Sequence, residues 1–64
     1  MEFIVGADES VDVAFKDNTY AYFPIAYIVK ETKRFVYIEG KDKSVLYPTK
    51  TVKRVEFLKN KEEE

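Results

Sequence analysis

The chain has 64 residues, of which 36% are charged, with a net charge of −1 and neither cysteine nor histidine. This length allows one domain, which buries only about 60% of the surface that the unfolded chain exposes. The missing residue types exclude disulfides, the usual zinc ligands, thiol nucleophiles and imidazole acid–base chemistry. We therefore expect a small, marginally stable domain without metal, cofactor or small-molecule substrate, and we predict that it is not an enzyme.

We expect no targeting signal at the N-terminal end of the sequence. Residues 1–5 are too few and too acidic for a signal peptide, and no apolar run approaches the roughly 20 residues of a membrane span. We expect no membrane partner, and the cytoplasm is the default location. Residues 3–5 are apolar and predict a short N-terminal strand.

The first clear strand is predicted over residues 11–15, where alternation puts Val11, Val13 and Phe15 on one face. Residues 16–18 predict its turn, because Asp and Asn tolerate left-handed dihedrals and bond back to the local backbone. Residues 20–30 supply the hairpin partner. Pro24 removes one ladder donor from this partner, so we predict a bend there.

Three more strands follow at hairpin spacing, over residues 34–39, 44–47 and 52–58. The segment between the last two, residues 48–51, is long enough for one 3₁₀ turn, and Pro48 fits its start. These elements predict an all-β domain over residues 1–58: a small antiparallel meander of five or six strands, which closes as a barrel to hide its edges. Residues 59–64 have no apolar anchor and are expected to form a frayed, charged tail.

The segment around Pro48 resembles the end of an SH3 domain. There a strand runs into Pro, then Ser or Thr, then a 3₁₀ turn, then the Val that opens the last strand; here the corresponding residues are Pro48, Thr49, Lys50, Thr51 and Val52. The likeness covers about a dozen residues and implies the SH3-like barrel superfold. The chain has no Trp for a polyproline groove and lacks the acidic, Tyr-rich N-terminal motif, so polyproline recognition is not implied.

Charge is distributed unevenly along the chain. Residues 1–29 carry five acidic side chains against one lysine, a net of −4, whereas residues 30–61 carry ten basic side chains against four acidic ones, a net of +6. If Val36 and Ile38 point into the core, alternation places aromatic rings beside cations on the opposite face, as in single-stranded nucleic-acid binders. The candidate nucleic-acid face consists of Lys33, Arg34, Phe35, Tyr37, Lys53 and Arg54. The alternative is that Phe35 and Tyr37 are core residues and the cations belong to an ordinary solvated surface.

Three tyrosines, Tyr20, Tyr22 and Tyr27, form a second cluster together with Phe23 and Ile25. Tyrosine is enriched where proteins meet, so these three side chains are the candidate protein interface. The alternative is a core with an amphipathic rim of phenol groups. A homodimer through this patch or through an open strand edge would also stabilise so short a chain.

No arrangement of residues indicates catalysis. Gly6 and Gly40 are isolated and suit turns, and neither the Asp8–Glu9 pair nor Asp42 has the spacing of a calcium loop. We predict a non-enzymatic binding or assembly module that acts through protein contacts, with a protein partner or a homo-oligomer. The alternative is a nucleic-acid-binding barrel, and a structural subunit of a larger particle is a third interpretation.

Overall fold

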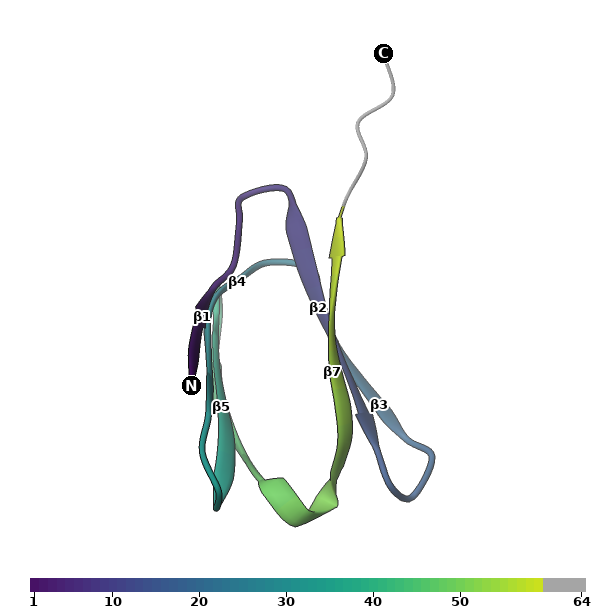
Figure 1. The fold of residues 1–64 in the computed structure, drawn as a ribbon. Coiled ribbons are helices and arrows are strands. Elements are labelled where there is room, and N and C mark those ends of the chain that lie inside the picture. The colour runs from purple at the N-terminus through teal and green to yellow at the C-terminus, as the bar shows by residue number, and fades with distance from the viewer. Residues whose placement is uncertain (60–64) are drawn as a thin grey trace.

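The computed structural model describes residues 1–59, which form seven strands and one 3₁₀ turn (Figure 1). In chain order the elements are β1 (Glu2–Ile4), β2 (Glu9–Phe15), β3 (Tyr20–Phe23), β4 (Ala26–Glu31), β5 (Phe35–Gly40), β6 (Ser44–Pro48), η1 (Thr49–Thr51) and β7 (Val52–Lys59). All of the strand pairs are antiparallel. The expectation of an all-β, antiparallel fold is therefore confirmed.

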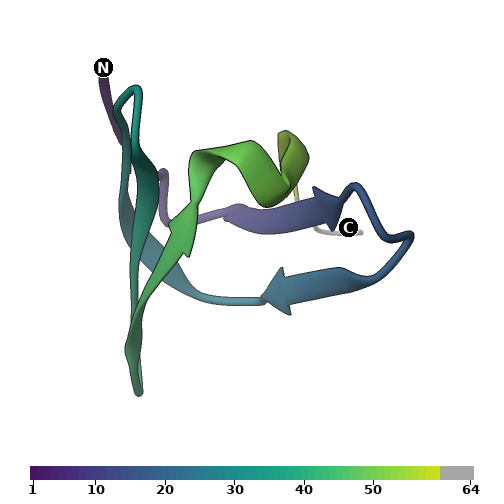
Figure 2. The same ribbon diagram turned by 90° about the horizontal axis from the view of Figure 1, so that it is seen from below.

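The strands form two sheets that face each other across the core (Figure 1). One sheet has four strands in the order β1-β4-β5-β6, and the other has three in the order β3-β2-β7. Within residues 1–59 no ladder joins the two sheets into a closed barrel. Figure 2 shows that β3 and β4 belong to different sheets although they are consecutive in the chain.

The chain passes from one sheet to the other at Pro24 and Ile25, which separate β3 from β4. The predicted bend at Pro24 is therefore present. It interrupts the strand predicted over residues 20–30, which becomes the two strands β3 and β4. This is why the structure has seven strands where five or six were expected. The meander is also interrupted, because β1 pairs with β4 and β7 pairs with β2.

The core is built by alternation, as the sequence predicts. Val11 and Val13 of β2 are fully buried, as are Val29 of β4 and Ile38 of β5, and Val36 is almost fully buried. Phe15 is half-buried and packs against this core, with its ring 4.8 Å from that of Tyr47 in an edge-to-face contact. The buried face of each sheet is thus mostly Val and Ile, which fit closely packed pleated surfaces.

The β2–β3 hairpin closes through the predicted turn. Asn18 has a φ of 72°, the left-handed conformation that Asn tolerates better than most residues. The Asp17 carboxylate accepts hydrogen bonds from the backbone N–H and the hydroxyl of Thr19, at 3.1 and 2.6 Å. These two bonds hold the turn in one conformation at the end of the hairpin.

The 3₁₀ turn η1 links β6 to β7, as predicted from Pro48. The Thr51 hydroxyl donates to the Pro48 carbonyl at 2.8 Å, and the Val52 N–H donates to the Thr49 carbonyl. The Thr51 carbonyl accepts from the Lys16 N–H at 3.0 Å, so the turn is also bonded to the end of β2. Through these contacts η1 carries the chain from the four-stranded sheet to the three-stranded one.

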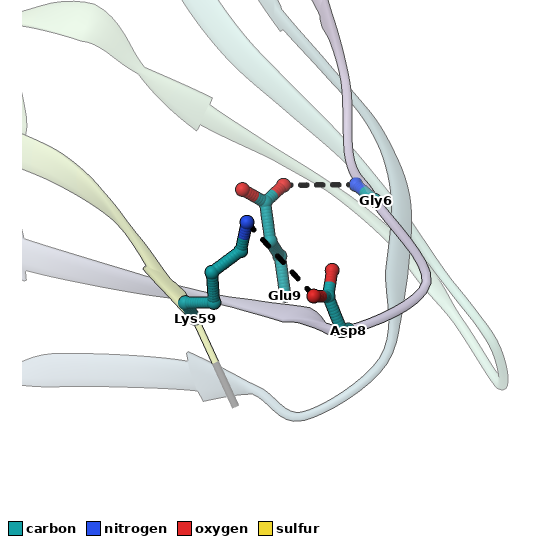
Figure 3. A network of polar contacts seen from close by, with 4 residues as sticks. All are labelled: Gly6, Asp8, Glu9 and Lys59. Carbon is teal, nitrogen blue, oxygen red and sulfur yellow. Dashed lines mark hydrogen bonds and ion pairs between the residues drawn. The ribbon is translucent and has the colours of Figure 1, made fainter. Parts of the chain in front are cut away.

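The end of β7 lies beside the β1–β2 loop (Figure 3). Glu9, the first residue of β2, accepts a hydrogen bond from the Gly6 N–H of this loop at 2.9 Å, and the Lys59 ammonium lies 3.9 Å from the Asp8 carboxylate. Lys59, expected to belong to the tail, is the last residue of β7. The rest of the expected tail, residues 60–64, lies outside the described residues.

Candidate functional site

The tyrosine surface, defined here as Tyr20 and Tyr22, lies on the outer face of the three-stranded sheet. Tyr20 pairs with Ala14 and Tyr22 with Asp12, while Val13 and Ala21 face the core between them. The Tyr20 and Tyr22 side chains remain 64% and 57% exposed. Two large aromatic residues that the core does not use are thus presented side by side from one strand.

Small residues occupy the central strand next to this surface. Ser10 and Ala14 alternate with the core residues Val11 and Val13 and are nevertheless buried. Ala14 lies between Tyr20 of β3 and Arg54 of β7, and Ser10 pairs with Leu58 of β7. The Ser10 hydroxyl has no hydrogen-bond partner among residues 1–59. Neither residue stands out in the sequence, since their burial depends on which strands flank β2 rather than on any local pattern.

Tyr27 does not belong to the tyrosine surface. It lies in β4, at the irregular position between the Ala26–Gly40 and Ile28–Glu39 pairs, in the other sheet. Its carbonyl accepts a hydrogen bond from the Val5 N–H at 2.9 Å, and its side chain borders a recess of about 300 Å³ beside the β1–β2 loop. The structure therefore brings together two of the three predicted tyrosines.

Phe35 and Tyr37 lie on the outer face of the four-stranded sheet, opposite Val36 and Ile38 of the core. Both are half-buried, because β5 is an interior strand with neighbours on each side. They line a shallow groove of about 440 Å³. The other residues that line it are Glu2, Ile28, Lys30, Glu39 and Leu46. The groove is therefore mixed in charge.

The cations predicted to accompany these rings are divided between the two sheets. Lys33 and Arg34 lie in the hairpin between β4 and β5, next to Phe35. Lys53 and Arg54 lie on β7, where Arg54 pairs with Ala14 of the three-stranded sheet. The Arg54 guanidinium is 3.6 Å from the Glu56 carboxylate, which offsets its charge. The six residues do not form one continuous face.

A larger recess, of about 470 Å³, lies between the β2–β3 turn and η1. Phe15 and Tyr47 form its aromatic wall, and Lys16 and Lys50 lie at its rim. Burial raises the pKa of the Tyr47 phenol above its ordinary value, and the hydrogen bonds from Thr19 lower the pKa of Asp17. No residue of this recess was predicted from the sequence to form a site. The sequence signal that could have indicated it is the position of Tyr47 directly before Pro48 and the predicted 3₁₀ turn.

No cluster of acidic side chains among residues 1–59 is arranged to hold a metal ion. None of the helical segments in the described part of the chain is long and apolar enough to cross a membrane. Comparison of the chain with protein-family models, with curated proteins and with solved structures gave no match. Its functional interpretation therefore rests on its own residues.

Proposed function

We propose that this chain is a non-enzymatic binding or assembly module that acts through protein contacts, and that its tyrosine surface makes the contact. The observation that carries the proposal is the exposure of Tyr20 and Tyr22 on one strand, at 64% and 57%. Phenol rings supply large contact areas at low cost in side-chain entropy and are enriched at the centres of interfaces. A cytoplasmic location is the default that accompanies this proposal.

To test the proposal, Tyr22 is replaced with a photoreactive phenylalanine analogue in the full chain. Cells of the organism that the chain comes from express this variant and are irradiated, and the proteins crosslinked to position 22 are identified by mass spectrometry. The control carries the same group at Tyr27, which is 47% exposed but lies in the other sheet. We expect protein adducts from position 22 in excess over position 27. No adducts at position 22, or adducts at position 27 alone, would contradict the proposal.

The architecture that we propose is an SH3-like small barrel, a finer assignment than two antiparallel sheets. It is supported by the strand that bends at Pro24 from one sheet to the other, and by the 3₁₀ turn that precedes the last strand. The pairing of the last strand with β2 also agrees with it. An experimental structure in which β2 lies between other strands than β3 and β7 would contradict this assignment.

The second candidate function is nucleic-acid binding. It is favoured by Phe35 and Tyr37, which face outward, and by Lys30, which pairs with Tyr37 on the same face. Stacking on the rings and phosphate neutralisation by lysine would supply the affinity. Fluorescence anisotropy with random oligonucleotides at about 50 and 200 mM salt tests it, because phosphate contacts weaken steeply with salt. Lack of binding at the lower salt would exclude this function.

A further inference from the structure

The strand that carries the tyrosine surface is an open edge of its sheet. β3 ends the order β3-β2-β7, and β2 is its one strand neighbour within residues 1–59. The Phe15 N–H donates to the Thr19 carbonyl at 2.9 Å, which marks these two residues as a hydrogen-bonded pair. Since such pairs alternate along an antiparallel ladder, Ala21 bonds to Val13. The N–H and C=O groups of Tyr20 and Tyr22 therefore point away from β2, toward the open edge.

The residues of β3 do nothing to block pairing at this edge. Its sequence is Tyr-Ala-Tyr-Phe, without charge, and Pro24 follows directly. The opposite edge strand, β7, carries the charged residues Lys53, Arg54, Glu56 and Lys59. Charged side chains are a common means of protecting sheet edges, whereas an uncharged edge invites another strand. β3 is therefore the uncharged edge of the three-stranded sheet.

We propose that the partner of this edge is a second copy of the chain, and that the two β3 strands pair antiparallel about a two-fold axis at Ala21. In this register Tyr20 of one copy pairs with Tyr22 of the second copy, and the reverse. Each of these pairs exchanges both N–H···O bonds, so all free backbone groups of Tyr20 and Tyr22 are used. Pro24, which has no N–H, ends the pairing.

The same register pairs the exposed rings. Tyr20 and Tyr22 point to one face, so each phenol ring comes beside a ring of the second copy. Cross-strand aromatic pairs are among the more stabilising pairs in antiparallel sheets. The Ala21 residues of the two copies lie opposite each other across the axis. They form a non-hydrogen-bonded pair, in which the Cα atoms are close and a small side chain fits. The contact is isologous, as a two-fold dimer requires.

A second uncharged edge strand, β6 of the four-stranded sheet, is the alternative site for pairing between two copies. Alternation leaves the backbone groups of Ser44 and Leu46 free there, as it does for the tyrosines of β3. Ser44 and Leu46 cannot form aromatic pairs, however, and the Pro48 carbonyl already accepts the Thr51 hydroxyl. β3 therefore offers the stronger self-complementary edge.

The first test uses the absence of cysteine from the chain. Ala21→Cys places a thiol at the two-fold axis, where paired Cα atoms about 4.5 Å apart allow a disulfide. Val45→Cys is the matched control, a half-buried position on the rival edge β6. We expect Ala21→Cys to form a covalent dimer under mild oxidation well ahead of Val45→Cys. Equal rates, no dimer, or a faster Val45→Cys reaction would each overturn the proposal.

The second test measures mass by sedimentation velocity as concentration rises about a hundredfold into the millimolar range, since interfaces under about 1,200 Å² bind weakly. The mass should rise from 7.5 kDa toward twice that value. Tyr22→Pro should stay monomeric with its fold retained, because the Tyr22 N–H faces the open edge, while Tyr27→Val should dimerise like the parent. A monomeric parent, or a Tyr22→Pro variant that dimerises like the parent, would overturn the proposal.

This inference rests on the proposed function, because it names the partner of the tyrosine surface, and the photocrosslinking experiment separates the two. Adducts at position 22 with a different protein alone would leave the proposed function standing and overturn the dimer. No adducts at position 22 would overturn both. Adducts between two copies of the chain would support both.

Discussion

The two outer faces of the molecule both carry a pair of aromatic residues, but they expose them to different extents. Tyr20 and Tyr22 lie on an edge strand and are more than half exposed, whereas Phe35 and Tyr37 lie on an interior strand and are half-buried. In both cases the residues alternate with others that face the core. Strand position in the sheet, rather than residue type, therefore determines which rings are free to meet a partner.

The largest effect is expected from Val36→Asp, which tests the inner side of the strand that carries Phe35 and Tyr37. Val36 is 3% exposed, so the substitution buries a carboxylate in an apolar core. The cost should exceed about 4 kcal/mol, a large part of the stability of a domain this small. Circular dichroism should show an unfolded chain at 25 °C.

Tyr37→Asp is the matched control for Val36→Asp, because Tyr37 is the next residue but faces outward. It should give a cooperative melt, with a smaller loss of stability from the lost packing in the groove. A cooperative melt of Val36→Asp at the parent temperature would show that the alternation of β5 is the reverse of that described here.

A smaller effect, on the edge strand, is expected from Ala21→Pro. The Ala21 N–H pairs with Val13, so proline there leaves the Val13 carbonyl without its donor, at a cost of about 1–3 kcal/mol. Tyr22→Pro should cost less than about 1 kcal/mol, because its N–H faces the open edge. Urea unfolding of both variants measures the difference. Equal losses of stability in the two variants would mean that the Tyr22 N–H does not face the open edge of β3.

Ser10→Ala should raise stability by about 1 kcal/mol. The Ser10 hydroxyl is buried and has no hydrogen-bond partner among residues 1–59, and an unsatisfied buried polar group is destabilising. The variant removes the hydroxyl and keeps the Cβ atom, now as a methyl group. Thermal unfolding at low protein concentration measures the effect on the monomer. A loss of stability would indicate that the hydroxyl is hydrogen-bonded in solution.

The local elements could be predicted from the sequence because their signals are local. The Val11–Val13 and Val36–Ile38 alternations, the turn at Asn18 and the bend at Pro24 each depend on a few adjacent residues. The division into two sheets could not be predicted, since it depends on pairings such as β1 with β4 that join distant segments.

The candidate sites were predicted less well than the strands, for the same reason. Tyr27 separates from Tyr20 and Tyr22 because Pro24 places it in the other sheet, and Arg54 separates from Phe35 because β7 pairs with β2. Neighbours in sequence are neighbours in space within a strand or hairpin. Beyond one hairpin, the strand order decides which side chains share a face.

The smallest effect is expected at the β2–β3 turn, whose conformation positions Tyr20. The Thr19 hydrogen bonds lower the pKa of Asp17 below its ordinary value in the folded chain. The stabilising contribution is therefore fully present above the unfolded pKa of about 3.9 and is lost as pH falls through the lower folded-state value. Because Asp17 is fully exposed, solvent screening keeps the effect small.

Asp17→Asn measures this contribution by removing the titrating group while keeping one acceptor oxygen for Thr19. Urea unfolding of the parent and of Asp17→Asn between about pH 5 and pH 2 should show the parent losing more stability over that interval. Asp42→Asn is the control, because Asp42 is an exposed acidic residue of the β5–β6 hairpin loop. Parallel pH profiles for the parent and Asp17→Asn would mean that the Thr19 hydrogen bonds do not persist in solution, and the turn that orients the edge strand would then be held by its backbone alone.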